Sequence, residues 1–228
     1  KVMIHCDHAG FRYEKSAYSL LQGISLNCMP GDFRYIYGKN GVGKTTFLKL
    51  LGLELRPTWG CIQIWDQQRS QTLDKKVINL WDKIGKIWPD NPLAEHMSLA
   101  ENVALPLYLR GLQWDKCLRQ ASDLLAWLCV AYPDAKAHSV SKSEQQRAII
   151  AQAVISKPQL ILADEPTRHL DAKGTRYLMY LLNNLNKQGT TIVLATHDRA
   201  LIRNFPYPTW EIDDRSIAPM EGYFHAYF

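Results

Sequence analysis

The chain contains the stretch Gly38-Lys39-Asn40-Gly41-Val42-Gly43-Lys44-Thr45-Thr46. Its spacing fits the pattern G-x-x-x-x-G-K-S/T, a loop that holds phosphate groups with its backbone amides. Residues 33–37 have the composition of a strand, and the apolar spacing of residues 47–51 is that of a helix. A glycine-rich surface turn is the alternative interpretation, but it leaves the lysine, the threonine and both flanks unexplained. The stretch therefore predicts a phosphate-binding loop between a strand and a helix.

Each residue type in this loop has a role toward the phosphates of a nucleotide. Glycine permits positive φ, so that successive N–H groups point inward and form an anion-binding nest. Lys44 supplies a positive charge to the β- and γ-phosphates, and the Thr45 hydroxyl is placed to ligate Mg²⁺. We expect phosphate contacts from the whole loop, namely Gly38, Asn40, Gly41, Gly43, Lys44, Thr45 and Thr46.

An acidic pair follows a continuous apolar run at 160–163, which is typical of a buried parallel strand. Asp164 ends this run, at the carboxyl end of a strand, where α/β sheets bind ligands. We expect Asp164 to hold Mg²⁺ together with Thr45. Glu165 is expected to orient or deprotonate the attacking water. A simple loop entry is the alternative for the pair, and the phosphate-binding loop favours the functional interpretation.

Two further residues are candidates for contacts with the nucleotide. His197 follows a second buried strand at 190–195, where its side chain is placed to donate to the γ-phosphate. A helix cap formed by residues 196–198 is the alternative interpretation. Tyr13 is a candidate for stacking on adenine, and an exposed tyrosine without a ligand is the alternative there.

Composition is that of an ordinary globular protein of 228 residues, with 46% hydrophobic and 21% charged residues. The net charge of +5 fits nucleotide binding or a nearby anionic membrane, and it fits equally a solvated surface without a special partner. The sequence lacks aromatic-basic repeats, so we expect no nucleic-acid partner. Its five cysteines are widely spaced and form no C-x-x-C pair, which indicates free thiols in a reducing compartment.

Membrane spans are not expected, because no apolar run approaches the ~20 residues that cross a bilayer. The first residues lack the apolar segment of a signal peptide. We therefore expect a cytoplasmic protein that reaches the membrane only through a partner.

The pattern along the chain predicts an α/β core with two additions. The first third mixes strands of alternating polarity with the phosphate-binding unit, and we expect residues 2–6 to form an edge strand. From 98 to about 132 the pattern is helical, beginning with a capping box formed by Ser98 and Glu101. The order predicts an antiparallel β subdomain and a helical subdomain attached to the core.

Together these motifs resemble the ATP-binding cassette (ABC) ATPases over nearly the whole chain. The family's Walker A loop is found at 38–46, and its Walker B strand at 160–165 continues into the string Leu-Ala-Asp-Glu-Pro-Thr at 162–167. A D-loop ending at 170–171, an H-loop at His197 and a signature-like segment at 141–147 complete the set. The resemblance implies an α/β P-loop NTPase fold of one domain, 1–228. Its core with the antiparallel β subdomain would comprise 1–88 and 156–228, and its helical subdomain 89–155.

The resemblance also implies an activity and partners. The protein would bind ATP and Mg²⁺ and hydrolyse ATP as a homodimer, with Ser141 contacting the ATP of the partner subunit. Strings at 21–24, 29–32, 54–57 and 101–107 look like those of FtsE-type cell-division ATPases. This implies an integral membrane partner like FtsX, through which cell-wall hydrolases are controlled from the inner face of the membrane. Lipoprotein-releasing and macrolide-efflux ATPases share most of these strings, so an exporter's motor is the alternative.

The chain departs from the family pattern at positions that act across the dimer or near the γ-phosphate. Lys142 and Ser143 replace the two glycines of the signature, and Pro89 stands where the family has a glutamine. In the D-loop, residues 168–169 are Arg-His, where the family usually has small residues. Near the end of the chain, Arg215 replaces a turn glycine. We therefore expect either an ATPase of slow turnover or an ATP-binding clamp or scaffold with little hydrolysis.

Overall fold

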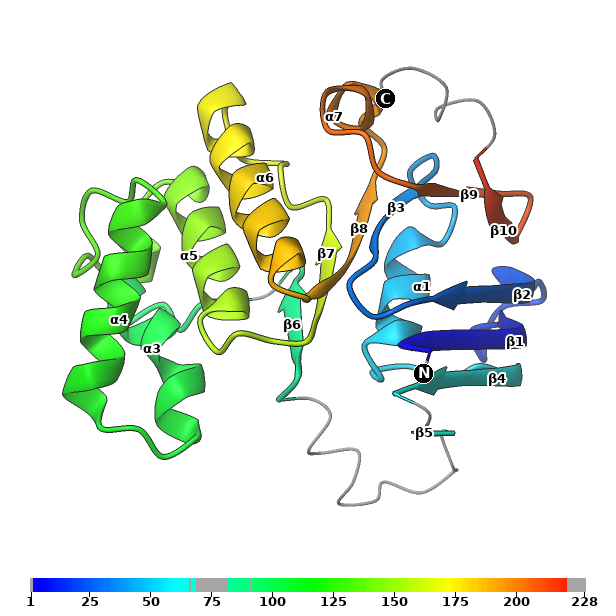
Figure 1. The fold of residues 1–228 in the computed structure, drawn as a ribbon, viewed down its shortest axis with the longest axis horizontal. Coiled ribbons are helices and arrows are strands. Elements are labelled where there is room, and N and C mark those ends of the chain that lie inside the picture. The colour runs from blue at the N-terminus through cyan, green and yellow to red at the C-terminus, as the bar shows by residue number, and fades with distance from the viewer. Residues whose placement is uncertain (1, 66, 69–81, 91, 221–228) are drawn as a thin grey trace.

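The computed structural model describes residues 2–65, 67–68, 82–90 and 92–220 (Figure 1). Its strands are β1 Ile4–Phe11, β2 Leu21–Cys28, β3 Phe33–Tyr37, β4 Trp59–Ile64, β5 Gln67–Gln68, β6 Ile84–Ile87, β7 Leu160–Asp164, β8 Thr191–Thr196, β9 Thr209–Asp213 and β10 Ser216–Pro219. Its helices are α1 Lys44–Leu51, α3 Leu99–Leu109, α4 Trp114–Trp127, α5 Lys142–Val154, α6 Ala172–Lys187 and α7 Arg199–Asn204, with a 3₁₀ turn, η1, at Ala137–Ser139. Residues 222–228, which the sequence left without an element, lie outside the described residues.

The strands form two sheets, as the sequence predicted. The larger sheet has the order β10-β9-β3-β8-β7-β6, in which all neighbours are parallel except the β9–β10 hairpin. The smaller sheet is antiparallel with the order β2-β1-β4-β5. The expected edge strand at 2–6 is wrong, because β1 lies between β2 and β4. Its second partner comes from far along the chain, and local sequence patterns do not report such pairing.

Helix α1 packs between the two sheets (Figure 1). Its apolar side chains, including Phe47 and Leu51, share one cluster with Ile62 of the small sheet and Leu162 of the large one. Strand β7 is buried on both faces, since Leu160 and Leu162 join this cluster while Ile161 and Ala163 join the other. Because both faces of β7 are buried, its sequence is continuously apolar instead of alternating.

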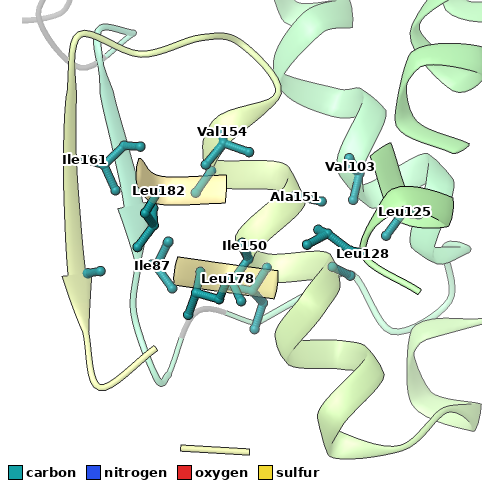
Figure 2. Packing of buried hydrophobic residues seen from close by; sticks show 14 of the residues in the cluster. Ile87, Val103, Leu125, Leu128, Ile150, Ala151, Val154, Ile161, Leu178 and Leu182 are labelled. Atoms are coloured by element: carbon teal, nitrogen blue, oxygen red, sulfur yellow. The ribbon is translucent and has the colours of Figure 1, made fainter. Parts of the chain in front are cut away.

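A second cluster joins the opposite face of the large sheet to the helical subdomain (Figure 2). Helix α5 stands in the middle, with Ile150 facing the sheet side and Ala151 facing Val103 and Leu125 of α3 and α4. The helical subdomain therefore shares one apolar cluster with the core, and the subdomain boundaries at 89 and 155 stay a prediction. Helix α3 begins with the capping box that the sequence predicted from Ser98 and Glu101.

Among the described residues, none of the helices has the length and apolarity required to cross a bilayer.

Candidate functional site

The phosphate-binding loop connects β3 to α1 and takes the conformation that its glycines allow. Gly41 has φ +80° and Gly43, the N-cap of α1, has φ +116°. These φ values strain any residue with a Cβ, and at Gly43 a Cβ would also lie 3.0 Å from the Leu21 side chain. The loop thus presents the N-terminus of a helix to an open cavity, the arrangement that binds phosphate.

The side chain of Lys44 binds the backbone of its own loop. Its side chain is only 6% exposed, and Nζ donates to the carbonyls of Gly38 at 2.8 Å and Lys39 at 3.1 Å. Nζ also lies 3.7 Å from Oε1 of Glu165. The ammonium group therefore stands between the loop and the acidic strand end, where a phosphate would bring its own acceptor oxygens.

Thr45 and Asp164 form the pair that the sequence predicted for Mg²⁺. Thr45 Oγ1 donates to Oδ2 of Asp164 at 2.5 Å. Asp164 ends β7 almost completely buried, and this burial raises the pKa of its carboxyl, with the neighbouring Glu165 charge adding to the rise and the Thr45 hydrogen bond opposing it. A buried carboxylate beside a hydroxyl fits a hard cation with oxygen ligands that completes its shell with substrate phosphates and water.

Glu165 and His197 meet, although the sequence assigned them to separate contacts. Nδ1 of His197 lies 2.6 Å from Oε1 of Glu165, and the backbone amide of His197 donates to the same oxygen at 2.9 Å. Oε2 accepts a hydrogen bond of 3.3 Å from Thr196 Oγ1. Glu165 itself has φ +46°, a left-handed conformation that non-glycine residues seldom adopt outside special sites.

The helix cap that was the alternative role for His197 is formed by the next residue, Asp198. Asp198 is the N-cap of α7, and its Oδ1 accepts from the amides of Ala200 at 2.8 Å and Leu201 at 3.2 Å. His197 is thereby free to face Glu165. The helix cap and the contact with the acidic residue are both present, on adjacent residues.

Tyr13 lies beside the start of α1. Its hydroxyl is 3.0 Å from Oγ1 of Thr46, and its ring stands perpendicular to Phe11 with the centroids 4.8 Å apart. About half of the residue is exposed. Tyr13 also borders a cavity of about 650 Å³, whose lining includes Arg12, Lys15 and Thr58. The tyrosine thus lies next to the phosphate loop.

Ser141 is not among the described residues that line the cavity of the phosphate loop. It is the N-cap of α5 and forms a capping box in which its Oγ accepts from the amide of Glu144 at 3.2 Å. Lys142 and Ser143 are the first residues of α5 and have helical backbone, so neither needs glycine's freedom. The Lys142 side chain folds back, with Nζ donating to Oε1 of Gln145 at 3.1 Å.

The cavity at the phosphate loop has a volume of about 260 Å³. Its described lining comprises Leu20, Asn40, Gly41, Gly43, Lys44, Thr45, Thr46, Pro89, Asp164, Glu165 and Arg168. The structure thus brings together nearly all residues that the sequence predicted for phosphate and Mg²⁺. Sequence reasoning noticed Arg168 as a departure from the D-loop pattern but did not place it at this cavity.

Comparison with known proteins identifies relatives of this arrangement. The model of the ABC transporter family matches residues 21–168. The chain is 34% identical over 227 residues to the cell division ATP-binding protein FtsE of Escherichia coli K12, with 98% of each chain covered. It is 33% identical over 202 residues to the lipoprotein-releasing system ATP-binding protein LolD of Aquifex aeolicus, covering 88% of this chain and 90% of that protein.

A solved structure shows the same fold over almost the whole chain. It is a dimeric ATP-binding cassette in a post-hydrolysis state, bound to ADP and Pi, with a TM-score of 0.88 and 28% sequence identity. The alignment covers 96% of this chain and 100% of that cassette.

Proposed function

The chain belongs to the ABC transporter family, and from this premise we propose that it is the ATP-binding subunit of an FtsE–FtsX-like membrane complex. It is an ATPase that binds ATP with Mg²⁺. As a homodimer it would drive an integral membrane partner in cell division from the inner face of the membrane. The observation that carries the proposal is the similarity to a cell-division ATPase over 98% of both chains.

In the proposed mechanism the loop at 38–46 binds the phosphates. Its amides at the start of α1 and the ammonium of Lys44 hold the β- and γ-phosphates, with Lys44 exchanging two carbonyl acceptors for phosphate oxygens. Thr45 and Asp164 hold Mg²⁺, which when bound neutralises charge on the transferring phosphoryl group. The buried carboxylate with its raised pKa supports this assignment, because a cation would relieve the cost of ionising it.

Glu165 is the proposed base, and His197 is proposed to contact the γ-phosphate while it orients Glu165. The carboxylate accepts from the His197 amide and from Thr196, so its position is fixed before a water arrives. A positioned general base contributes about 10²–10⁴ to the rate. The 3.7 Å approach of Lys44 Nζ to Glu165 keeps the base next to the phosphate site.

Two further contacts complete the proposed site. Tyr13 stacks on adenine, supported by its hydrogen bond to Thr46 at the loop's end. Ser141 contacts the γ-phosphate bound to the other subunit, supported by its place at the N-terminus of α5 outside its own cavity. The dimeric arrangement of the related cassette supports a site shared between subunits.

The membrane partner is proposed to dock near residues 89–93 and the helical subdomain. A groove of about 470 Å³ lies there, and its lining includes Pro92 and Leu93 together with Gln145 and Ile149 of α5. An amphipathic segment of the partner would bury its apolar side in such a groove.

The test compares ATP turnover and membrane association with the partner present and absent. We expect the chain to co-purify with an FtsX-like membrane protein expressed beside it, to appear in the membrane fraction only then, and to hydrolyse ATP in the complex. Glu165→Gln should bind ATP and assemble but fail to turn over. Co-purification with a lipoprotein-releasing permease instead would favour the exporter's motor, which the similarity to LolD also supports.

A second candidate, an ATP-binding clamp with little hydrolysis, is favoured by one observation. Pro89 lines the phosphate cavity where a glutamine would offer an amide, and proline has no side-chain donor or acceptor. If wild type and Glu165→Gln both bind ATP and neither hydrolyses it with an FtsX-like partner present, the clamp is the function.

A further inference from the structure

Arg168 reaches the phosphate cavity of its own subunit. Among the described residues that line this cavity, Lys44 and Arg168 carry the positive charges. A turn fixes the arginine, because its amide donates to the carbonyl of Glu165 at 3.1 Å while Glu165 has φ +46°. The adjacent His169 lines the neighbouring groove instead, so the two large residues of this turn border different cavities.

The guanidinium of Arg168 has no partner among the described residues. Both carboxylates at the cavity are engaged elsewhere, Asp164 by Thr45 and Glu165 by His197 and Thr196. The arginine is exposed, so it keeps its hydration until a ligand replaces water. An uncommitted guanidinium beside a phosphate-binding loop offers paired N–H donors that match two phosphate oxygens.

We propose that Arg168 binds the γ-phosphate of the ATP held by its own subunit. This inference rests on the ATP site of the proposed function. Arg168 adds a positive charge to a cavity that Pro89 also lines without a side-chain donor or acceptor, and charge on the transferring phosphoryl oxygens grows toward the transition state. Arg168 thus supplies, within its own subunit, part of the hydrogen bonding to phosphate that a glutamine at position 89 would offer and Pro89 does not.

The test measures ATP and ADP affinity separately, by displacement of a fluorescent nucleotide, for wild type, Arg168→Ser and Arg168→Lys. Protein is kept at a concentration where sedimentation shows a monomer. Arg119→Ser, an exposed arginine on α4, is the matched control. Arg168→Ser should weaken ATP binding about tenfold and leave ADP binding unchanged, because ADP lacks the γ-phosphate. The ATP affinity of Arg168→Lys should lie between those of wild type and Arg168→Ser, since lysine keeps the positive charge but lacks the paired N–H donors of the guanidinium.

Turnover in the assembled dimer gives a second readout. Arg168→Ser should lower kcat at saturating ATP at least about tenfold, and this loss should shrink in a Pro89→Gln background that restores an amide. An equal loss in both backgrounds would overturn the compensation of Pro89 by Arg168.

Several results would overturn the γ-phosphate assignment. They are an ATP affinity of Arg168→Ser equal to that of wild type, an equal loss for ATP and ADP, or an effect that appears only in the dimer and so belongs to the other subunit's nucleotide. If wild type itself fails to bind ATP, the proposed function fails and this inference fails with it. If wild type binds ATP and only the Arg168 variants contradict expectation, the proposed function stands.

Discussion

His197 and Glu165 are joined through two contacts on one oxygen. Oε1 of Glu165 lies 2.9 Å from the backbone nitrogen of His197 and 2.6 Å from its Nδ1. The two residues follow neighbouring parallel strands, β7 and β8, whose register places Asp164 opposite Ala195. The carboxylate and the imidazole therefore form one unit at the edge of the phosphate cavity, and their contributions to catalysis should be coupled.

Glu165→Gln should abolish most turnover and preserve ATP binding. The amide keeps the volume, and its single oxygen can still accept from the His197 backbone amide, but it cannot take a proton from water, so kcat should fall about 10²–10⁴-fold. Steady-state phosphate release and equilibrium ATP binding measure the two effects. Asp123→Asn, an exposed carboxylate on α4, is the control and should behave as wild type. Turnover near the wild-type level in Glu165→Gln would assign the base to another residue.

His197→Ala should lower kcat less than Glu165→Gln, by about tenfold to a hundredfold, because the backbone amide still holds Oε1. In the Glu165→Gln background, His197→Ala should cost clearly less than it costs in wild type, because its role in orienting Glu165 is already lost there and only its contact with the γ-phosphate remains. A double-mutant cycle on kcat tests this. Losses that multiply would contradict the coupling and indicate that His197 acts on phosphate independently.

The sequence predicted the large features of the fold because they depend on local patterns. The phosphate loop, the buried strands and the capping box of α3 follow from spacing and residue type, and the structure shows them at 38–46, 160–164, 191–196 and 98–101. The sequence did not predict the inner position of strand β1, because its second partner, β4, pairs Ile4 with Ile64 and Gly10 with Trp59, far along the chain.

Within the site, strand ends could be predicted and lateral contacts could not. That Thr45 and Asp164 meet could be predicted, because a helix start and a strand end meet at the same edge of an α/β sheet, while their role toward Mg²⁺ stays a prediction. The contact between Glu165 and His197 depends on which strands are neighbours, which the sequence does not state. Arg168 lies in a turn, where no periodicity indicates which surface a residue faces. The sequence therefore did not predict that Arg168 lines the phosphate cavity.

Asp164→Asn should stabilise the ligand-free protein at neutral pH, by about 1 kcal/mol. Burial raises the pKa of Asp164 in the folded state, so ionising it lowers the free energy of unfolding. The gain should be absent below the ordinary Asp pKa, grow as pH rises through the raised pKa, and stay constant above it. Urea unfolding at several pH values measures this. Saturating Mg²⁺ and ATP should reverse the order by stabilising wild type alone. A gain that persists unchanged at low pH would contradict the electrostatic cause.

Arg215→Gly should stabilise the protein by about 1 kcal/mol, a rise in Tm of about 2–4 °C. Asp214 and Arg215 form the turn of the β9–β10 hairpin with φ +39° and +68°, a conformation that suits glycine. Arg215→Ala is the matched control, because it removes the same stacking on Tyr18 but keeps a Cβ at positive φ. Thermal unfolding of the two variants isolates the backbone term, and equal Tm values would show that the turn is unstrained.

Ser141→Ala and Ser98→Ala separate capping from action on a second subunit. Each serine forms a capping box, with Glu144 at the start of α5 and with Glu101 at the start of α3, so each substitution should cost about 1 kcal/mol of stability. Only Ser141→Ala should also weaken ATP-dependent dimerisation, which size exclusion measures in the Glu165→Gln background. With Glu165 intact, Ser141→Ala should also lower ATP turnover about tenfold or more. Ser98→Ala should match its parent in both assays. If the two variants lose stability equally and dimerise equally, Ser141 is a helix cap alone, and contact with the other subunit's phosphate must come from the amides of Lys142 and Ser143.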